Sequence, residues 1–393
     1  MELKISKFDY FGRGIGRIND KVVFVSKALP NEIINIKLIK EKSKFSEGIV
    51  SNIIKSSDNR IEAICPYYNK CGGCTFLHTT YDVEKDFKIN KAIELLGRCD
   101  NFYETNNLNY RNKVTLHVKD NKIGYYEEKS NSLVEIKYCY LLNDNINKVI
   151  DDLVNCNLNK VNKIIIKTHK NKILVNFFGE INKDIINKLS YVDTIISDNK
   201  IVKGNGYLEE EINGKKFKIT SEAFFQVNNE GLLNILDIIN NFLNNKKINN
   251  VLDLYSGISL WGILISDKVS NVTSIEINKE ACQNAKDGLI KNNITNVTVI
   301  NGDVKDYIDK FKDIDLVLID PPRSGLDKKT RDYLKIINSQ YIIYISCDMI
   351  SLKRDLEELK ELYIIKEIDL VDMFKRTYHV ESVCLLSRKS VDR

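Results

Sequence analysis

The sequence predicts a multidomain protein with a small β-barrel at the N-terminus, a central mixed α+β domain and a C-terminal α/β domain. A chain of 393 residues is too long for one ordinary domain. Short strand-like runs fill residues 1–56, mixed segments fill residues 57–218, and strand and helix alternate regularly over residues 219–393. Regular alternation of this kind is typical of a doubly wound, Rossmann-like parallel sheet. We therefore expect three domains with these boundaries.

The N-terminal segment has short strand-like runs separated by turns, for example Val22–Val25, Ile33–Ile39 and Gly48–Ile54. This spacing predicts a small barrel of the OB-like kind. Basic residues at positions 4, 7, 13, 17, 21 and 27 alternate with the aromatic residues Phe8, Tyr10, Phe11 and Phe24. Small barrels bind single-stranded nucleic acid through a basic groove with stacking rings. The same composition also fits solvated lysines around an ordinary core.

Bulk properties limit the class of protein. The net charge of +5 permits a nucleic-acid partner without requiring one. No apolar run approaches the roughly 20 residues of a membrane span, and the first ten residues do not resemble a signal peptide. We expect a cytoplasmic protein, with a monomer as the default. Nine cysteines in such a chain favour a metal site or catalysis over disulfides.

Three cysteines follow one another closely in Cys65-Pro-Tyr-Tyr-Asn-Lys-Cys71-Gly-Gly-Cys74. Their spacing predicts a metal site with Cys139 as the fourth ligand, and His78 is a possible replacement for one of them. Spacing alone does not separate tetrahedral zinc from an iron–sulfur cluster, since both accept four cysteines. The remaining cysteines besides Cys347 show no partnering pattern and are expected to be structural: Cys99, Cys156, Cys282 and Cys384.

An amphipathic helix is predicted over residues 82–97, ending at Gly97. Further strands are predicted in the central segment, at Lys113–Val118 and Lys163–Ile166. The expected apolar positions of the helix are Val83, Phe87, Ala92, Ile93, Leu95 and Leu96.

The C-terminal segment contains a nucleoside-binding pattern. A strand at Val251–Leu254 runs into a turn containing Tyr255 and Gly257, and a second strand ends at Glu276, nineteen residues after Gly257. A glycine turn admits a nucleoside, and an acid about 20 residues later accepts hydrogen bonds from ribose hydroxyls. The turn lacks the G-x-G-x-x-G pattern of dinucleotide binding. Asp303, after a third strand, could face an adenine amine, and the cofactor that fits is S-adenosylmethionine.

Two further apolar runs end in reactive side chains. Residues 315–319 lead into Asp320-Pro-Pro-Arg323-Ser-Gly-Leu, and residues 341–345 lead into Ser346-Cys347-Asp348. Buried parallel strands present ligand-binding residues at their carboxyl ends. We therefore expect Asp320 and Cys347 to point into one crevice. A cysteine at such a position is commonly a small core residue, but the neighbouring Pro-Pro break opens a pocket and favours a nucleophile.

These features together resemble the RNA uracil-5-methyltransferases that carry an N-terminal TRAM barrel and an iron–sulfur cluster. The resemblance covers nearly the whole chain, and the motifs in this order are specific. They are the glycine-rich barrel start, Cys65…Cys71-Gly-Gly-Cys74…Cys139, Phe224-Phe-Gln226-Val-Asn228, Asp253-Leu-Tyr255-Ser-Gly257-Ile, Asp320-Pro-Pro-Arg-Ser-Gly-Leu, Ser346-Cys347 and Thr377-Tyr-His379-Val-Glu381-Ser-Val.

The resemblance implies a class I methyltransferase domain that methylates carbon 5 of uridine in RNA. It favours 23S rRNA as the substrate, with tRNA as the alternative. It also implies a set of site residues: nucleophile Cys347, proton acceptor Glu381, S-adenosylmethionine contacts Gln226, Tyr255, Glu276 and Asp320, and [4Fe–4S] ligands Cys65, Cys71, Cys74 and Cys139.

The sequence departs from the family pattern at four places. Ser259 replaces a glycine, which predicts a tighter approach to the cofactor, and Asp348-Met349 replaces Asn-Pro. Asp348 could raise the pKa of Cys347 by like-charge repulsion. Leu77 and Lys375 replace a common glutamine and a common proline.

The residue types suit this chemistry. Carbon 5 of uracil is a poor nucleophile, and a thiolate that adds to C6 makes it electron-rich. A base such as Glu381 must later remove the C5 proton, and the target base must leave any stack to reach the cysteine. One rival interpretation is an amino-methyltransferase, but such enzymes carry an aromatic residue where Arg323 stands. Another is a non-catalytic RNA-binding protein with structural zinc.

Overall fold

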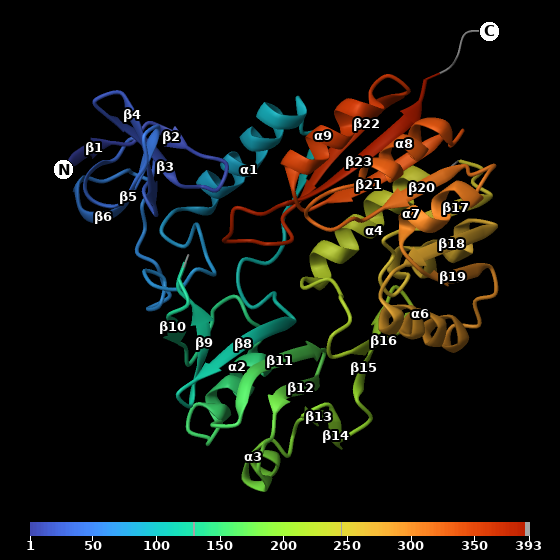
Figure 1. Cartoon of the computed structure of the whole chain (residues 1–393), viewed down its shortest axis with the longest axis horizontal. Coiled ribbons are helices and arrows are strands. Elements are labelled where there is room, and N and C mark those ends of the chain that lie inside the picture. Colours follow the sequence, from blue (N-terminus) through green and yellow to red (C-terminus); the bar gives the residue numbers. More distant parts are fainter. Residues whose placement is uncertain (129, 245, 390–393) are drawn as a thin grey trace. The chain divides into compact units, whose positions relative to one another are not determined.

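The computed structural model describes residues 1–128, 130–244 and 246–389, and the chain forms two compact units (Figure 1). Unit 1 comprises Met1–Gly97, Tyr125–Val134 and Phe374–His379. Unit 2 contains the rest of the described chain. The domain boundaries near residues 56 and 218 stay a prediction. Within the described residues, no helix combines the length and the apolar character that crossing a membrane requires.

Unit 1 begins with a six-stranded sheet, which confirms the predicted N-terminal β domain. Neighbouring strands are antiparallel except for the parallel pair β4 and β6, and the strand order is β1-β5-β6-β4-β3-β2. Alternate apolar side chains of these strands, such as Val23, Val25, Ile34 and Ile36, form its core. The strands are β1 (Glu2–Lys4), β2 (Lys7–Phe8), β3 (Gly14–Ile18), β4 (Lys21–Ser26), β5 (Ile33–Glu41) and β6 (Phe45–Lys55).

Helix α1 (Tyr81–Leu96) confirms the predicted helix and ends at Gly97, whose φ of 83° is the left-handed conformation that a helix C-cap requires. The predicted apolar face is wrong in part. Phe87 and Ala92 are buried, but Ile93 is 48% exposed. The other buried positions are Glu84, Lys88 and Lys91.

Buried charges explain this difference. Glu84 and Lys88 are both 0% exposed, and their side chains are joined at 2.6 Å. The same Glu84 Oε1 accepts a hydrogen bond from the backbone N–H of Arg376 at 2.6 Å, and the Arg376 carbonyl accepts one from the backbone N–H of Thr75 at 2.8 Å. Segment Phe374–His379 is therefore built into unit 1 by α1 and the loop before it. Sequence periodicity did not reveal this, because the partner lies almost 300 residues away.

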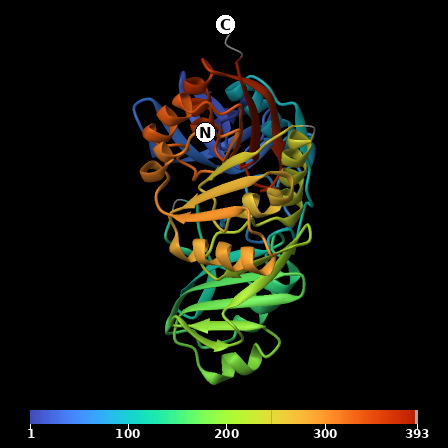
Figure 2. The same ribbon diagram turned by 90° about the vertical axis from the view of Figure 1, so that its right-hand side faces the viewer.

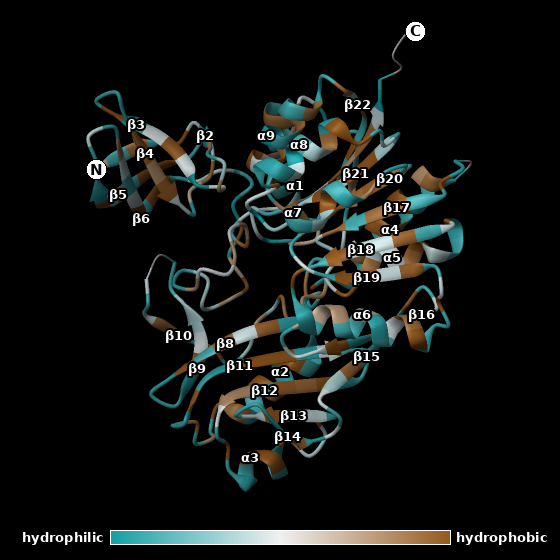
Figure 3. Ribbon diagram, turned by 45° about the vertical axis from the view of Figure 1, so that its right-hand side comes forward, coloured by the Kyte–Doolittle hydropathy of each residue, from teal (hydrophilic) through white to brown (hydrophobic). Residues whose placement is uncertain are grey.

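A seven-stranded sheet in the order β10-β9-β8-β11-β12-β13-β14 belongs mostly to unit 2, while its segment Tyr125–Val134 is assigned to unit 1. Its centre is formed by β11 and β12, whose apolar runs are buried and stand out in brown in Figure 3. A two-stranded ribbon follows, made of β15 (Tyr207–Ile212) and β16 (Lys215–Thr220). The other elements are β8 (Lys113–Lys119), β9 (Lys122–Tyr126), β10 (Leu133–Glu135), α2 (Asp144–Leu153), β11 (Val161–His169), β12 (Lys172–Gly179), α3 (Lys183–Lys188), β13 (Thr194–Ser197) and β14 (Lys200–Lys203).

The second sheet of unit 2 has eight strands in the order β19-β18-β17-β20-β21-β23-β22-β7. Strands β19, β18, β17, β20 and β21 run parallel, and β23 is antiparallel to β21. The strands are β7 (Asn101–Tyr103), β17 (Asn250–Leu254), β18 (Asn271–Glu276), β19 (Val297–Asn301), β20 (Leu316–Ile319), β21 (Tyr341–Ser346), β22 (Tyr363–Val371) and β23 (Glu381–Arg388).

Helices cover this second sheet on both faces. Helices α4, α5 and α6 form one packed series, and α7, α8 and α9 form another. Figure 2 shows α4 in yellow on one side of the sheet and α8 and α9 in orange-red on the other. The predicted doubly wound α/β domain is thereby confirmed. The helices are α4 (Asn229–Leu243), α5 (Leu260–Ile265), α6 (Lys279–Lys291), α7 (Val304–Tyr307), α8 (Lys328–Ile336) and α9 (Met349–Leu359), with short 3₁₀ turns at Ser266–Lys268 and Ile308–Lys310.

The buried ion pair of α1 makes a testable prediction. Glu84→Ala leaves the Lys88 ammonium buried without its carboxylate, which should lower the free energy of unfolding by about 3–5 kcal/mol. Glu94→Ala, on an exposed position of the same helix, should change it by less than about 0.5 kcal/mol. Urea unfolding followed by circular dichroism measures both, and equal midpoints for the two variants would contradict the assignment.

Candidate functional site

Three strands bring the key side chains to one edge of the eight-stranded sheet. Parallel β20 and β21 end side by side, and Asp320 and Cys347 directly follow their carboxyl ends. Strand β23 runs the opposite way, and Ser382 pairs with Ser346. Glu381, one residue earlier on β23, therefore enters the sheet at the edge where Cys347 leaves it.

Charged groups surround the half-buried Cys347. Burial raises the pKa of its thiol to about 12, and the negative charges of Glu381 and Asp320 act in the same direction. The positive charge of the nearby Arg323 acts in the opposite direction and lowers this pKa. Arg323 is thus the group that favours the thiolate form in this crevice.

The two acids of the crevice are also shifted. Burial is the main reason why the pKa of Glu381 lies well above its usual range, with Asp320 adding to the shift and Arg323 opposing it. Burial raises the pKa of Asp320 to about 6. The indole Nε1–H of Trp261 opposes that shift by donating a hydrogen bond to Asp320 Oδ2 at 3.1 Å. Burial thus disfavours the ionised form of both acids, Arg323 offsets this for Glu381, and Trp261 offsets it for Asp320.

Sequence reasoning missed Arg323 and Trp261 as site residues. Arg323 served only to argue against an amino-methyltransferase, although a cation directly after a Pro-Pro break at a strand end was an available signal. Trp261 lies in the buried helix α5, where a tryptophan ordinarily indicates core packing.

The turn after β17 fits a nucleoside-containing cofactor. Glu276 Oε2 accepts a hydrogen bond from the backbone N–H of Gly257 at 2.9 Å, and Oε1 accepts one from that of Asn278 at 2.7 Å. Gly257 has a φ of 55° and open space where a side chain would stand. Asp253 Oδ1 and Ser256 Oγ are buried, with no hydrogen-bond partner among the described residues. The open space at Gly257 leaves room for a ligand to approach the backbone of this turn closely.

Two residues of this turn point away from the open space. The Tyr255 hydroxyl donates to Asp327 Oδ2 at 3.2 Å and lies 3.3 Å from Thr330 Oγ1, at the start of α8, so its ring is the part left for a cofactor contact. Ser259 is fully buried, and its hydroxyl lies 2.7 Å from that of Ser274 on β18. The prediction that Ser259 tightens the approach to the cofactor is wrong, because its side chain faces the interior.

Gln226 lies buried on the segment that joins β16 to α4. Its carbonyl accepts a hydrogen bond from Asn112 Nδ2 at 3.1 Å. Lys167, buried on β11, donates to the carbonyls of Thr220 and Ala223 at 2.7 Å each, and burial lowers the pKa of Lys167 to about 7. Side chains of the seven-stranded sheet thus fix the segment that carries Gln226. A lysine within a strand gave no sign of this role in the sequence.

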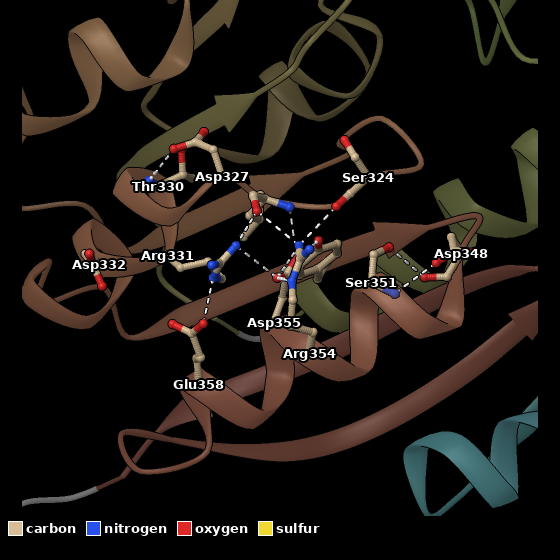
Figure 4. Close-up of polar contacts among 12 residues, drawn as sticks. Ser324, Asp327, Thr330, Arg331, Asp332, Asp348, Ser351, Arg354, Asp355 and Glu358 are labelled. Atoms are coloured by element: carbon tan, nitrogen blue, oxygen red, sulfur yellow. Dashed lines mark hydrogen bonds and ion pairs between the residues drawn. The ribbon is translucent and has the colours of Figure 1, made fainter.

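Asp303 and Asp348 both serve as helix caps. Asp303 accepts a hydrogen bond from the backbone N–H of Lys305 at 3.3 Å and pairs with its ammonium. Asp348 Oδ1 accepts a hydrogen bond from the backbone N–H of Ser351 at 2.8 Å, at the start of α9 (Figure 4). The groups that raise the pKa of Cys347 are Glu381 and Asp320 together with burial. That Asp348 adds to this effect stays a prediction.

Three cysteines of unit 1 interact electrostatically with one lysine. Burial lowers the pKa of Lys27, while Glu128 and, after it, Cys71, Cys74 and Cys65 act in the opposite direction. Cys139 belongs to unit 2. Across residues 1–128, 130–244 and 246–389, no three His, Cys, Asp or Glu side chains form a group that could hold a metal ion.

His78 has a partner other than a metal. Its Nδ1 lies 2.6 Å from the Tyr68 hydroxyl, and both rings are buried. Burial, followed by the positive charges of Arg60 and Lys27, lowers the pKa of His78 to about 3. His78 is therefore a neutral, packed histidine beside the cysteine loop.

A groove of about 490 Å³ on unit 1 is lined by Phe11, Arg13, Lys27 and Tyr378, among others. Phe11 is 46% exposed, and its ring packs edge-on against Tyr378 with 5.5 Å between centroids. The Arg13 guanidinium bonds to Asp9 at 2.7 Å. The basic and aromatic residues predicted for nucleic-acid binding are thus split between an exposed groove and internal pairs.

Comparison with known proteins adds to this geometry. A family model described as tRNA (Uracil-5-)-methyltransferase matches residues 83–389, and a TRAM domain model matches residues 1–51. An uncharacterized RNA methyltransferase of Clostridium acetobutylicum is 32% identical, with 98% of this chain and 96% of the relative covered. One of Aquifex aeolicus is 29% identical, with 99% of each covered.

A solved structure shares the whole fold. The crystal structure of Pyrococcus abyssi tRNA (uracil-54, C5)-methyltransferase in complex with S-adenosyl-L-homocysteine superposes with a TM-score of 0.81. It is 23% identical, and the match covers 98% of this chain and 100% of that one. At this identity the likeness shows the fold.

The contact between Arg323 and Cys347 makes a prediction for the ligand-free protein. Arg323→Gln should raise the pKa of the Cys347 thiol, so that about tenfold less of it is present as thiolate. Because a thiolate of higher pKa is also more nucleophilic, alkylation at fixed pH should slow only roughly three- to fourfold. In the unaltered protein, alkylation should accelerate with each pH unit up to about pH 10, because the pKa of Cys347, about 12, lies above that range. Iodoacetamide labelling of the Cys347 peptide, followed by mass spectrometry, gives the rates. Lys353→Gln, an exposed cation on α9, is the control, and equal rates for all three proteins would refute the contact.

Proposed function

The chain belongs to the tRNA (uracil-5-)-methyltransferase family and is an RNA (uracil-5-)-methyltransferase that uses S-adenosylmethionine, and on that premise we propose that Cys347 is its nucleophile and Glu381 its base. The observation that supports this is the meeting of Cys347, Glu381 and Arg323 at one sheet edge, with Asp320 beside them. A non-catalytic RNA-binding role is set aside by the family assignment.

The proposed reaction starts at the Cys347 sulfur. Its thiolate adds to C6 of the uracil, and the C5=C6 electrons move to C5 as an enolate. C5 then attacks the methyl group, so that a C–C bond forms as the methyl–sulfur bond of S-adenosylmethionine breaks. Glu381 takes the C5 proton, the C6–sulfur bond breaks, and the C5=C6 double bond returns.

The electrostatics of the crevice suit these steps. Arg323 offsets the negative charge on sulfur both when the thiolate forms and when it is expelled. The raised pKa of Glu381 makes its carboxylate, once ionised, a stronger base for the C5 proton than an exposed glutamate. The ring must be rotated out of its stack to reach this buried edge.

We propose that Gln226, Tyr255, Glu276 and Asp320 hold S-adenosylmethionine, which supplies the methyl group. Glu276 is placed to receive ribose hydroxyls, since its carboxylate already closes the Gly257 turn. Gln226 is buried and Asp320 is half-buried, and each accepts a hydrogen bond from a neighbouring side chain, Asn112 and Trp261 respectively. The site is therefore pre-organised before a ligand binds.

The RNA substrate is proposed to be 23S rRNA, as the combination of TRAM domain and four cysteines favours. The alternative is tRNA, which the description of the matching family model favours. Phe224, 62% exposed and two residues before Gln226, provides a ring on which an unstacked base can rest. Mapping 5-methyluridine in rRNA and tRNA from a strain that lacks this gene decides between the two substrates.

We also propose that Cys65, Cys71, Cys74 and Cys139 hold a [4Fe–4S] cluster. The donor chemistry fits, since four thiolates are the usual ligands of such a cluster, and the charge of Lys27 favours the thiolate forms of Cys65, Cys71 and Cys74. The reaction contains no redox step, so the cluster would serve a structural role, in which it holds the cysteine loop in the shape that binds RNA. Iron and sulfide analysis with an absorption spectrum of anaerobically purified protein tests this, and colourless protein with one zinc would contradict it.

Two variants of the reacting residues test the chemistry. Cys347→Ala should lower methylation of RNA by at least about 10³-fold, because the ring is then not activated. Glu381→Gln should still form the bond to C6 and transfer the methyl group, but should accumulate a covalent protein–RNA adduct because the C5 proton stays in place. Denaturing gels with labelled RNA measure the adduct. Normal turnover by Cys347→Ala, or no adduct with Glu381→Gln or with 5-fluorouridine RNA, would overturn the assignment.

A further inference from the structure

The second half of the loop between β20 and α8 is anchored by helix α9. The Arg354 guanidinium donates to the carbonyls of Ser324 and Leu326 at 3.0 Å each. Arg331 donates to the same Leu326 carbonyl. The backbone N–H of Leu326 donates to Asp355 Oδ2 at 2.9 Å. Figure 4 shows these side chains converging on the loop from α8 and α9.

Asp355 is the centre of this anchor and is 0% exposed. Besides Leu326, it accepts hydrogen bonds from the Tyr344 hydroxyl at 2.7 Å and from Arg354 Nε at 2.8 Å. Arg331 Nη1 lies 3.6 Å from its Oδ1. A side chain at Gly325, where φ is 70°, would place its Cβ 2.6 Å from Asp355 Oδ2. The loop therefore passes as close to this carboxylate as a polypeptide can.

Asp355 also ties the loop to the strand that carries Cys347. Tyr344, which donates to Asp355, lies on β21 three residues before Cys347. Helix α9, which carries Asp355, begins two residues after Cys347 and is capped by Asp348. A single carboxylate thus sets the spacing between the Cys347 turn and the loop.

The residue that depends on this spacing is Arg323, a long and exposed side chain. A long side chain on a mobile loop would spend little time beside Cys347, because ordering it there costs conformational entropy. The Ser324 carbonyl, directly after Arg323, accepts a hydrogen bond from Arg354, and the Asp320 side chain, three residues before it, accepts one from Trp261. We propose that Asp355 is a positioning residue that, through the Arg323 loop, keeps the guanidinium of Arg323 against the sulfur of Cys347. The proposal rests on the proposed function of Cys347 as the nucleophile.

Asp355→Asn tests the proposal, because it keeps the size of the side chain and removes its charge. Single-turnover methylation at saturating substrates should slow by about 10²-fold, the cost of a misplaced reacting group. Alkylation of Cys347 in the ligand-free protein should slow about threefold, as for Arg323→Gln. In the double variant Arg323→Gln/Asp355→Asn, alkylation should slow no further, because both changes remove the same contact.

Glu358→Gln is the matched control. It removes the other partner of Arg331, at 2.9 Å from its Nε, without touching the loop, and should leave both rates within about twofold of wild type. Should Asp355→Asn fail to fold, Arg354→Met removes the bonds to Ser324 and Leu326 from a half-exposed position. It should then slow alkylation by a smaller factor than Arg323→Gln does.

Three outcomes overturn the positioning role. The first is an unchanged alkylation rate of Cys347 in Asp355→Asn. The second is a double variant in which the two single slowing factors for alkylation multiply. The third is a methylation rate that falls only as far as the amount of folded protein in a thermal melt. Failure of the proposed function gives a different pattern: Cys347→Ala would methylate RNA normally, while the alkylation rates would still depend on Asp355.

Discussion

The antiparallel pairing of β21 with β23 is the constraint on which the site depends. Parallel strands alone would bring only their carboxyl ends to this edge of the sheet, with the turns that follow them. Because Ser346 pairs with Ser382, the first residue of β23 stands beside the residue that follows β21. The proposed nucleophile and the proposed base, more than thirty residues apart in sequence, are thereby brought together by backbone hydrogen bonds.

That placement has an electrostatic consequence. Two carboxyl groups and a thiol share a largely dry crevice, so each disfavours the ionised form of the others. Arg323 is the cation that acts on both the thiol and one of the acids, since its positive charge favours the ionised forms of Cys347 and Glu381. The position of Arg323 therefore matters for the charge balance of the crevice. The bond between Trp261 and Asp320 holds the chain before Arg323, and the Asp355 anchor holds the loop after it.

The sequence allowed the strands and their ends to be predicted, because breakers follow apolar runs at Asp320 and Cys347. It also predicted the Gly257–Glu276 pair, whose spacing reflects one strand–helix–strand unit. Buried charges were not predictable in this way. Glu84, Lys167 and Asp355 look like solvent-facing residues of a helix or strand, and only partners distant in the chain make them interior. The wrong expectation for Ser259 has the same origin, since its side chain faces the buried hydroxyl of Ser274.

The composition of unit 1 from three separate chain segments affects how the protein is made. Its helix α1 carries Glu84, whose partners include the backbone of Arg376. During translation the ribosome releases the first 97 residues long before that segment. For most of synthesis, Glu84 and Lys88 are therefore present without the backbone N–H of Arg376 that completes their hydrogen bonding. Unit 1 therefore reaches its final state only when nearly the whole polypeptide has emerged. For the same reason, a fragment that ends at Gly97 would lack part of its own interior.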